Sequence, residues 1–371
     1  MSHYSVMIKP ASALCNLRCA YCFYCDASAH RKGTPPEIMT RETAERVIQN
    51  IFAGLEDGDS LEICFQGGEP TLAGLAYFRH FVRQVRRQPQ KGKVTYALQT
   101  NGMELDREWC AFLREHRFLV GLSIDAYPQH HNAYRVDAQG KGTFGRVMEA
   151  KRLLEETGVE HNVLCTLTNP LARHPQKVWQ FIKQARIAYI QFTPCLGGLE
   201  GERSEWALTP QRFYSFYTGL YKLWKRDVEE GPYISVKLFD DLLNLFFFQR
   251  VTACGLHGQC QIQNIVEADA SAYPCDFYAL DAYYGGSLRE QSLAQVRERL
   301  EGTGFLGERE ALPEACGECK YRKLCNGGCK RMAQAMYVDA KTGFCGYRHL
   351  LEDIGQDLCD CGAALLRKRS P

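Results

Sequence analysis

The sequence predicts an α/β fold: a partial, TIM-like (β/α)6 barrel followed by a C-terminal cysteine-rich domain. Three observations lead to this prediction. Short apolar runs alternate with longer amphipathic stretches up to about residue 200, and the composition becomes rich in cysteine and glycine after about residue 252. The length of 371 residues also exceeds that of one typical domain.

Six short apolar runs are the expected strands. They cover residues 4–10, 61–68, 94–102, 118–125, 161–168 and 189–195. Helical patterns separate them, such as residues 40–55, which open on the helix-capping residue Thr40. This alternation is typical of βαβ units in a parallel sheet. Six units are too few to close an eight-stranded barrel, so we expect an open barrel with its chemistry at the carboxyl ends of the strands.

The composition predicts three segments: a barrel at 1–235, a linking helix at 236–252 and a cysteine-rich domain at 253–371. The linking helix contains the apolar run "LLNLFFF" at 242–248, which we expect to be buried. We expect the basic tail "RKRSP" at 367–371 to be disordered.

The charges are nearly balanced, with 45 Lys and Arg against 43 Asp and Glu and a net charge of +2. We therefore expect neither nucleic acid nor a membrane as a partner. The N-terminal segment 1–14 lacks the basic and apolar regions of a signal peptide, and no stretch reaches the roughly 18 apolar residues of a membrane span. We expect a cytoplasmic protein, and in a reducing compartment a count of 18 cysteines indicates metal ligands rather than disulfides.

Cys15, Cys19 and Cys22 form a C-x-x-x-C-x-x-C motif directly after the first predicted strand. A zinc site would need a fourth thiolate, such as Cys25, whereas three thiolates can hold a four-iron cluster with one iron open. The spacing, with the aromatic Tyr21, resembles the motif of the radical S-adenosylmethionine (SAM) superfamily. The resemblance implies that the open iron binds SAM, whose cleavage gives a 5′-deoxyadenosyl radical, and that Cys25 is not a ligand.

"QGGEP" at 66–70 ends the second predicted strand and taken alone would also suit an ordinary turn. Its glycines let backbone approach a ligand closely, and in this context it resembles the superfamily's site for the methionine amine. The resemblance assigns cofactor binding to Tyr21, Gly67, Gly68, Glu69, Ser123, Arg135 and Leu196. Arg135 suits a carboxylate because a guanidinium donates in parallel pairs, although it would also suit a surface salt bridge. Leu196 would equally suit the core.

Eight further cysteines follow residue 250, enough for two four-cysteine sites. Two structural zinc ribbons would use them equally well. Their order resembles the SPASM domain of radical enzymes that modify peptides and proteins, which implies two auxiliary [4Fe-4S] clusters acting as electron relays, and three clusters in all. By this resemblance the ligands are Cys254, Cys260, Cys275 and Cys329 for one cluster and Cys316, Cys319, Cys325 and Cys345 for the other. Cys64, Cys110, Cys165, Cys195, Cys359 and Cys361 are expected to be buried or incidental thiols.

From residue 8 to about residue 347 the motifs follow the order of the anaerobic sulfatase-maturating enzymes, which the chain resembles. The resemblance implies an oxidoreductase that converts a cysteine or serine in a C/S-x-P/A-x-R segment of an unfolded or nascent sulfatase to Cα-formylglycine, by hydrogen abstraction from Cβ. It makes Asp276 the catalytic base and places Tyr24 and Gln99 against the substrate. Asp276 would also suit a loop-capping role, and Tyr24 would also suit packing. A flavodoxin or ferredoxin is the expected electron donor.

Two other functions stay open: a radical SAM maturase that forms a thioether or carbon-carbon crosslink in a ribosomal peptide, and a non-catalytic iron-sulfur or zinc scaffold. Peptide maturases often carry an N-terminal leader-binding domain, and the short segment before Cys15 favours the sulfatase maturase. One departure stands out. Relatives usually show "DGP" where this chain has "DAYP", so Ala126 and Tyr127 alter a loop near the cofactor, which would bear on substrate preference.

Overall fold

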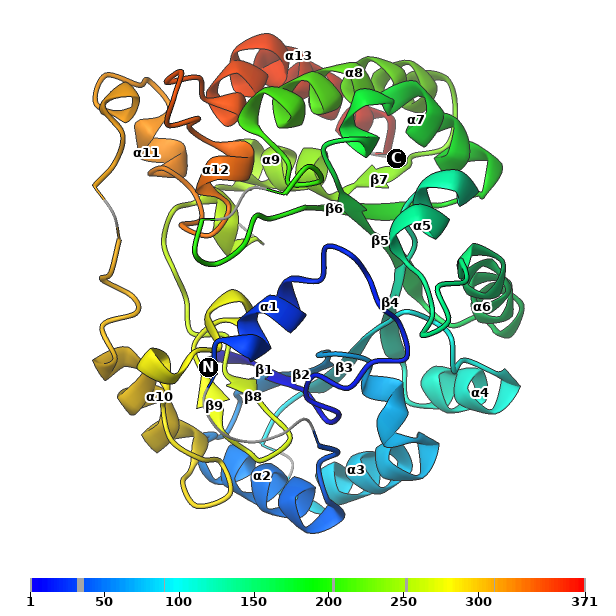
Figure 1. The fold of residues 1–371 in the computed structure, drawn as a ribbon, viewed down its shortest axis with the longest axis vertical. Helices are drawn as coiled ribbons and strands as arrows, with labels where there is room; N and C mark the ends of the chain where they lie inside the picture. The colour runs from blue at the N-terminus through cyan, green and yellow to red at the C-terminus, as the bar shows by residue number, and fades with distance from the viewer. Residues whose placement is uncertain are drawn as a thin grey trace. The chain divides into compact units, whose positions relative to one another are not determined.

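The computed structural model describes residues 2–31, 37–89, 91–201, 204–250, 253–309 and 311–369. They form the predicted α/β fold with parallel strands (Figure 1). The chain divides into two compact units. The first unit contains Met1–Ser123, Asn132–His161 and Gln261–Glu308, and the second contains Ile124–His131, Asn162–Cys260 and Arg309–Pro371. The domain limits expected from the sequence stay a prediction.

The first unit is built on six strands in the order β4-β3-β2-β1-β8-β9. Their bounds are β1 His3–Ile8, β2 Ser60–Phe65, β3 Val94–Thr100, β4 Phe118–Ser123, β8 Ile265–Val266 and β9 Ala272–Tyr273. Strands β1 to β4 are parallel, β8 joins β1 in parallel, and β9 pairs with β8 in antiparallel orientation. The carboxyl ends of the five parallel strands therefore lie at one edge of the sheet.

Helices of the first unit lie on both sides of its strands. Their bounds are α1 Phe23–Ala29, α2 Arg41–Ala53, α3 Leu75–Arg87, α4 Arg107–Glu115, α6 Phe144–Thr157 and α10 Leu293–Gly302, with short turns η1 Pro70–Ala73, η4 Asp276–Tyr278 and η5 Asp281–Tyr283. Helices α2 and α3 pack on one side, where the Phe65 and Phe81 ring centroids are 5.1 Å apart, and α1 lies on the other side (Figure 1). Thr40 caps α2 by accepting a 3.1 Å hydrogen bond from the Thr43 amide.

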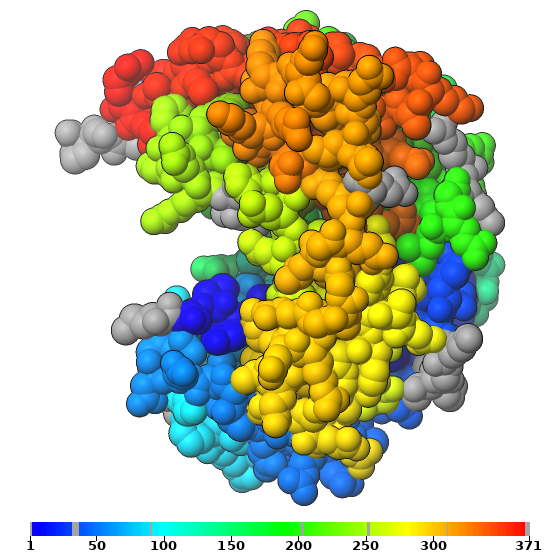
Figure 2. All heavy atoms as spheres, turned by 90° about the vertical axis from the view of Figure 1, so that its left-hand side faces the viewer, coloured from blue at the N-terminus to red at the C-terminus, as the bar shows by residue number. Residues whose placement is uncertain are grey.

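The segment from Gln261 to Glu308 is distant in sequence but packs within the first unit. Strand β8 pairs with β1, and α10 packs against α2. In the space-filling view this segment appears in yellow, beside the blue residues of the N-terminal part (Figure 2). Residues from late in the sequence, on either side of β8, therefore lie at the carboxyl end of β1.

The second unit contains three parallel strands in the order β7-β6-β5. The strand bounds are β5 His161–Leu167, β6 Tyr189–Pro194 and β7 Ser235–Val236, and the helices are α7 Pro175–Gln184, α8 Pro210–Glu230, α9 Lys237–Phe248, α11 Arg322–Cys325, α12 Ala333–Met336 and α13 Gly346–Arg369. Its short turns are η2 Leu171–Arg173, η3 Cys254–Leu256 and η6 Glu314–Cys316, and helix α5, Pro128–Tyr134, begins in this unit and ends in the first. Helix α8 packs against α7 and α13, with a 2.9 Å hydrogen bond from the Tyr221 hydroxyl to Asp357.

All six predicted strands are present, and the positions of the two-residue strands β7, β8 and β9 were not predicted because these strands are too short to show a period. Two smaller expectations are wrong. The run at 242–248 is not wholly buried, since Phe247 and Phe248 are 38% and 58% exposed at the end of α9. Helix α13 continues through Arg369, so the tail is not disordered there, and its last two residues lie outside the described part. No helix among the described residues is long and apolar enough to cross a membrane.

Candidate active site

Polar side chains line one face of the first unit's sheet at the carboxyl ends of its strands. The register pairs Met7 with Cys64, Cys64 with Ala97, and Gln99 with Gly121. Side chains alternate between the two faces of a strand, so positions two residues apart share a face. This places four side chains on the same face: Lys9, Gln66, Gln99 and Ser123. Two of them, Gln99 and Ser123, were predicted site residues, and the other two were not.

The predicted cluster cysteines lie on the loop between β1 and α1. Cys15, Cys19 and Cys22 are all half-buried. Burial raises the pKa of the Cys15 thiol to about 11, and the charges of the other two thiols add to this shift, because the three lie close together. Two donors from elsewhere in the unit approach the loop: Asn101 Nδ2 lies 3.8 Å from Cys15 Sγ, and Arg135 Nη1 lies 3.8 Å from Cys19 Sγ.

Cys25 lies beside the motif but is exposed. Its thiol hydrogen-bonds to Cys22, and this bond is the main cause that lowers the pKa of Cys22 to about 6. The same hydrogen bond is the main cause that raises the pKa of Cys25 itself, and burial and the charges of the neighbouring thiols add to this shift. The expectation that Cys25 is not a ligand stays a prediction.

The cysteine loop is tied by its backbone to the segment that carries Arg135. The Arg18 amide donates to the Val136 carbonyl at 2.7 Å, and the Ala20 amide donates to the Tyr134 carbonyl at 3.1 Å. The Arg135 guanidinium carbon lies 5.6 Å from the centroid of the Tyr21 ring. The predicted cofactor residues Tyr21 and Arg135 are therefore neighbours, which their separation in sequence does not reveal.

The glycines of "QGGEP" are required by the close approach of the cysteine loop. Gly67 has a φ of 125°, and a Cβ on Gly68 would lie 2.1 Å from the Leu14 carbonyl oxygen. The Gly68 and Glu69 amides donate to the carbonyls of Ser12 and Leu14 at 2.7 and 2.8 Å. Close backbone approach was expected at this position for a ligand, and in the structure the backbone that approaches is the protein's own loop.

Glu69 is buried and its carboxylate is fully engaged within the protein. It accepts hydrogen bonds from the Thr71 hydroxyl at 2.6 Å, the Thr100 hydroxyl at 2.8 Å and the Asn101 amide at 2.8 Å. Burial raises the pKa of Glu69 even though these donors favour its charged form. Since Asn101 in turn approaches Cys15, Glu69 helps to position the cysteine loop through Asn101. Its predicted contact with the cofactor stays a prediction.

Asp276, the predicted base, lies at the start of η4 in the first unit and is buried. Its Oδ1 lies 2.5 Å from Lys9 Nζ, and its Oδ2 accepts a 2.9 Å hydrogen bond from Gln66 Nε2. Neither partner was predicted. A charged residue directly after an apolar strand, in "VMIKP", was the available indication for Lys9.

Tyr24, predicted to face the substrate, is also buried here. Its hydroxyl donates to Glu267, whose two carboxylate oxygens lie 2.7 and 2.6 Å away. The centroid of its ring lies 3.5 Å from Lys9 Nζ. Arg31 forms a 2.7 Å ion pair with Glu267. Burial opposes the charge on Glu267, but the cations Lys9 and Arg31 outweigh it and lower the pKa of this carboxyl. We call Lys9, Tyr24, Arg31, Glu267 and Asp276 the Lys9 cluster.

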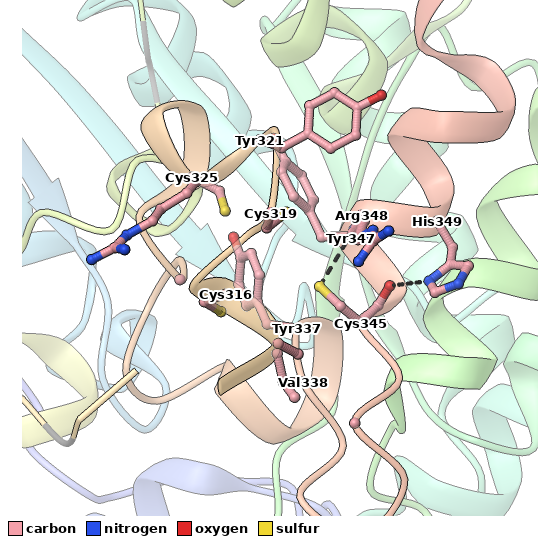
Figure 3. A pocket seen from close by; sticks show the side chains of 14 residues that line it. Cys316, Cys319, Tyr321, Cys325, Tyr337, Val338, Cys345, Tyr347, Arg348 and His349 are labelled. Atoms are coloured by element: carbon pink, nitrogen blue, oxygen red, sulfur yellow. Dashed lines mark hydrogen bonds between the residues drawn. The ribbon is translucent and has the colours of Figure 1, made fainter. Parts of the chain in front are cut away.

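Four of the C-terminal cysteines line one pocket in the second unit. Figure 3 shows Cys316, Cys319, Cys325 and Cys345 around the same space, with Tyr337 and Tyr347 beside them. Burial raises the pKa of Cys345 to about 11, and the charges of Cys325 and Cys316 add to the shift. These four are the residues that the sequence resemblance assigns to one auxiliary cluster.

The other predicted set is divided between the units. Cys254, Cys260 and Cys329 lie near one another in the second unit, where burial and the neighbouring thiols raise the pKa of Cys254 to about 11. Cys275 belongs to the first unit, and Leu196 to the second. Among the described residues no three His, Cys, Asp or Glu side chains are arranged to hold a metal ion. Both ligand sets therefore stay predictions.

The remaining cysteines behave as expected of thiols with no assigned role. Cys110, Cys165, Cys195 and Cys361 are buried, and Cys64 and Cys359 are half-buried. Burial raises the pKa of Cys64 to about 12, with Glu62 and Asp276 adding to the shift.

Comparisons with known proteins identify the family. Residues 10–183 match the model of the radical SAM superfamily. A cysteine-type anaerobic sulfatase-maturating enzyme of Clostridium perfringens is 38% identical over 88% of this chain and 89% of its own length. A serine-type enzyme of Bacteroides thetaiotaomicron is 28% identical over 91% of this chain and 85% of its own.

Solved structures agree with these relatives. The structure described as native anSMEcpe with bound AdoMet and Cp18Cys peptide superposes with a TM-score of 0.88 at 33% identity, covering 98% of this chain and 99% of that one. Streptococcus suis SuiB bound to the precursor peptide SuiA reaches a TM-score of 0.62 at 15% identity, covering 91% of this chain and 75% of that one, which shows the fold alone. The chain is therefore a radical SAM enzyme, an oxidoreductase, and belongs to the anaerobic sulfatase-maturating family.

Proposed function

We propose that this enzyme oxidises a cysteine, or less readily a serine, in a C/S-x-P/A-x-R segment of a sulfatase to Cα-formylglycine. The observation that carries the proposal is the family relation along almost the whole chain, at 38% identity to a cysteine-type enzyme and 28% to a serine-type enzyme. The higher identity to the cysteine type supports cysteine as the preferred residue. The protein partner is an unfolded or nascent sulfatase, since the target side chain must reach a buried site.

The residues of the first unit fit a SAM-binding iron-sulfur cluster. Cys15, Cys19 and Cys22 would hold the cluster, since they lie together on one loop, where the charges of Cys19 and Cys22 help to raise the pKa of Cys15, and a metal stabilises such thiols as thiolates. The residues that would hold SAM are Tyr21, Gly67, Gly68, Glu69, Ser123, Arg135 and Leu196. Reductive cleavage of bound SAM supplies a 5′-deoxyadenosyl radical, which removes a hydrogen atom from the substrate Cβ. A flavodoxin or ferredoxin is the proposed electron donor.

Two further clusters in the SPASM domain would accept the second electron. The pocket lined by four cysteines supports the set Cys316, Cys319, Cys325 and Cys345. The proximity of three thiols in the second unit supports the set that Cys275 would complete: Cys254, Cys260 and Cys329. Anaerobic reconstitution should then give about 12 irons per chain, from three four-iron clusters, whereas zinc ribbons would give about 4 irons and stoichiometric zinc.

Asp276 would take the proton from the substrate thiol or hydroxyl. The substrate loses a hydrogen atom from Cβ to the deoxyadenosyl radical, the thiol or hydroxyl proton to an Asp276 oxygen and one electron to the relay, which leaves a thioaldehyde or an aldehyde. Water then hydrolyses the thioaldehyde and releases hydrogen sulfide. Tyr24 and Gln99 would border the substrate. The position of Gln99 supports this role, since the buried carboxylate of Asp276 lies on the same face of the sheet.

The test is anaerobic incubation of the reconstituted enzyme with SAM, dithionite and matched peptides containing "CTPSR" or "STPSR", followed by mass spectrometry. The cysteine peptide should lose one sulfur and two hydrogens, gain one oxygen and react with a carbonyl reagent. It should be converted faster than the serine peptide. Unchanged peptides in the presence of 5′-deoxyadenosine formation would contradict the proposal and favour a crosslinking peptide maturase.

A further inference from the structure

We propose that Lys9 is a positioning residue for Asp276, which it holds by a buried ion pair in the orientation needed to take the substrate proton. The inference rests on the proposed function, because it concerns the base of that reaction. Lys9 directly follows β1, at the strand's carboxyl end. It is two residues beyond Met7 and therefore shares the face of the sheet that carries the site.

The burial of Lys9 needs a reason. Its side chain is 0% exposed, and an ammonium group removed from water is stable only when other groups replace its hydration. Asp276 Oδ1 at 2.5 Å, Glu267 Oε1 at 3.7 Å and the Tyr24 ring at 3.5 Å surround it here, and they stabilise it by charge and cation–π attraction rather than by a hydrogen bond. All three partners surround the nitrogen that points at the predicted base.

The two oxygens of Asp276 are held separately. Lys9 takes Oδ1, and Gln66 donates to Oδ2 at 2.9 Å. These two side chains come from adjacent parallel strands and share one face, so the carboxylate bridges the ends of β1 and β2. Asp276 itself lies on the three-residue turn η4. Side chains at the ends of two strands therefore fix the orientation of its carboxylate.

Lys9 is anchored in turn by Glu267. The Lys9 amide donates to the Val266 carbonyl at 2.8 Å, which brings the next residue, Glu267, beside the lysine. Glu267 is itself fixed by Tyr24, by Arg31 at 2.7 Å and by the Ser12 hydroxyl at 3.0 Å. Two cations thus balance two carboxylates in the Lys9 cluster, and removal of Lys9 would leave two carboxylates with the single guanidinium that pairs with Glu267.

A displaced Asp276 would have a specific chemical consequence. The hydrogen atom would still leave the substrate Cβ, but loss of the thiol proton to Asp276 and loss of the electron would no longer follow in step. The substrate radical would then take up an electron from dithionite and a proton from water, which restores the unmodified peptide and leaves 5′-deoxyadenosine behind. SAM cleavage would continue while the yield of aldehyde per 5′-deoxyadenosine falls, a split that a general loss of folding does not produce.

The test compares Lys9→Met with the matched control Lys151→Met. Lys151 is also buried, with a side chain 4% exposed and a 2.5 Å ion pair to Glu155, but it lies on α6 outside the Lys9 cluster. Misplacement of a catalytic group by about 1 Å costs up to about 100-fold, so Lys9→Met should lower the aldehyde to 5′-deoxyadenosine ratio at least about tenfold with KM little changed. Lys151→Met should keep the wild-type ratio, and propylammonium should partly restore the ratio in Lys9→Ala.

A crystal structure of Lys9→Met provides the second readout, since it requires no turnover. The Asp276 carboxylate should have rotated away from its position between strands β1 and β2. A wild-type ratio in Lys9→Met, or an unmoved Asp276 in its crystal structure, would overturn the inference. Wild-type enzyme that converts neither peptide would instead overturn the proposed function, and the crystal structure would still decide the role of Lys9.

If Lys9→Met does not fold, as judged by circular dichroism, Glu267→Gln decides the question because it keeps the lysine but weakens its anchor. The ratio should then fall about threefold, since the ammonium loses one of its three partners. An unchanged ratio in folded Glu267→Gln, with Lys9→Met unfolded, would overturn the inference.

Discussion

The two cysteine regions of this enzyme are held by different means. The cysteine loop of the first unit, between β1 and α1, is supported from behind by Asn101 and Arg135 and by backbone hydrogen bonds to residues 134 and 136. The pocket of the second unit is lined by cysteines on turns and on helices such as α11, which has only four residues. The first region rests on a sheet, and the second rests on short irregular segments.

The chain of the second region reverses directly after Cys325. Asn326, Gly327 and Gly328 have φ angles of 39°, 75° and 67°, which glycine adopts freely and asparagine tolerates. A Cβ on Gly328 would lie 1.8 Å from the Tyr337 ring. Isolated helical turns of four residues are unstable in water, so packing around the pocket and any metal within it must stabilise these segments. The comparison therefore predicts that metal loss affects the two regions unequally.

Removal of iron should produce the largest effect. After anaerobic chelation, limited proteolysis should cut first within residues 311–349, because these turns lose the ligand bonds that organise them, while the cysteine loop and β1 stay protected by the sheet. Mass spectrometry of the fragments locates the cuts. The reconstituted enzyme, digested in parallel, is the control. First cuts within residues 2–31 would contradict the comparison.

A pair of tyrosine variants sharpens the comparison at the wall of the pocket. The Tyr337 hydroxyl donates to the Gly255 carbonyl at 2.7 Å, whereas the buried Tyr347 hydroxyl has no hydrogen-bond partner among the described residues. Tyr337→Phe should lower the free energy of unfolding by about 1–2 kcal/mol, because a buried acceptor loses its donor. Tyr347→Phe should be neutral or stabilising, because it removes a buried polar group that is not paired.

Thermal unfolding of the reconstituted variants under argon measures this difference. Tyr337→Phe should lower the midpoint by about 2–4 °C and Tyr347→Phe should not lower it. Equal destabilisation by the two substitutions would show that the hydroxyl groups are not what distinguishes these rings.

The smallest expected effect is at Ala126, the position where the family resemblance leads us to expect glycine. Ala126 is buried and has a φ of 53°, a left-handed conformation that costs an L-residue about 1 kcal/mol. Ala126→Gly should stabilise the enzyme by less than about 1 kcal/mol, since the greater entropy of unfolded glycine offsets part of the gain. Ala150→Gly, within α6, is the matched control and should destabilise by about 1 kcal/mol. A destabilised Ala126→Gly would exclude backbone strain at this turn.

Much of the fold could be predicted because its strands are apolar runs and its helices are amphipathic over several turns. The run at 94–102, for example, contains β3, Val94–Thr100. The two-residue strands β8 and β9 could not be predicted, since a pattern that short has no period. Those strands are what bring Glu267 and Asp276 beside β1.

The cysteines and strand ends of the site could be predicted because their spacing is visible along the chain. Lys9 and Glu267 could not, since a single lysine or glutamate after a strand is normally a solvated residue. Only the pairing of β8 with β1, across more than two hundred residues of sequence, places the two charges together. The glycines of "QGGEP" were predicted to allow close approach, but the sequence did not reveal that Leu14 and Ser12 are what approaches.

The most direct measurement of the central claim uses a cysteine peptide deuterated at Cβ. With reconstituted wild-type enzyme, SAM and dithionite, deuterium should appear in 5′-deoxyadenosine, and the same peptide should carry an aldehyde that retains the other deuterium. Unlabelled 5′-deoxyadenosine, or a labelled one accompanied by a crosslinked peptide without aldehyde, would contradict the assignment of this enzyme as a formylglycine-generating sulfatase maturase.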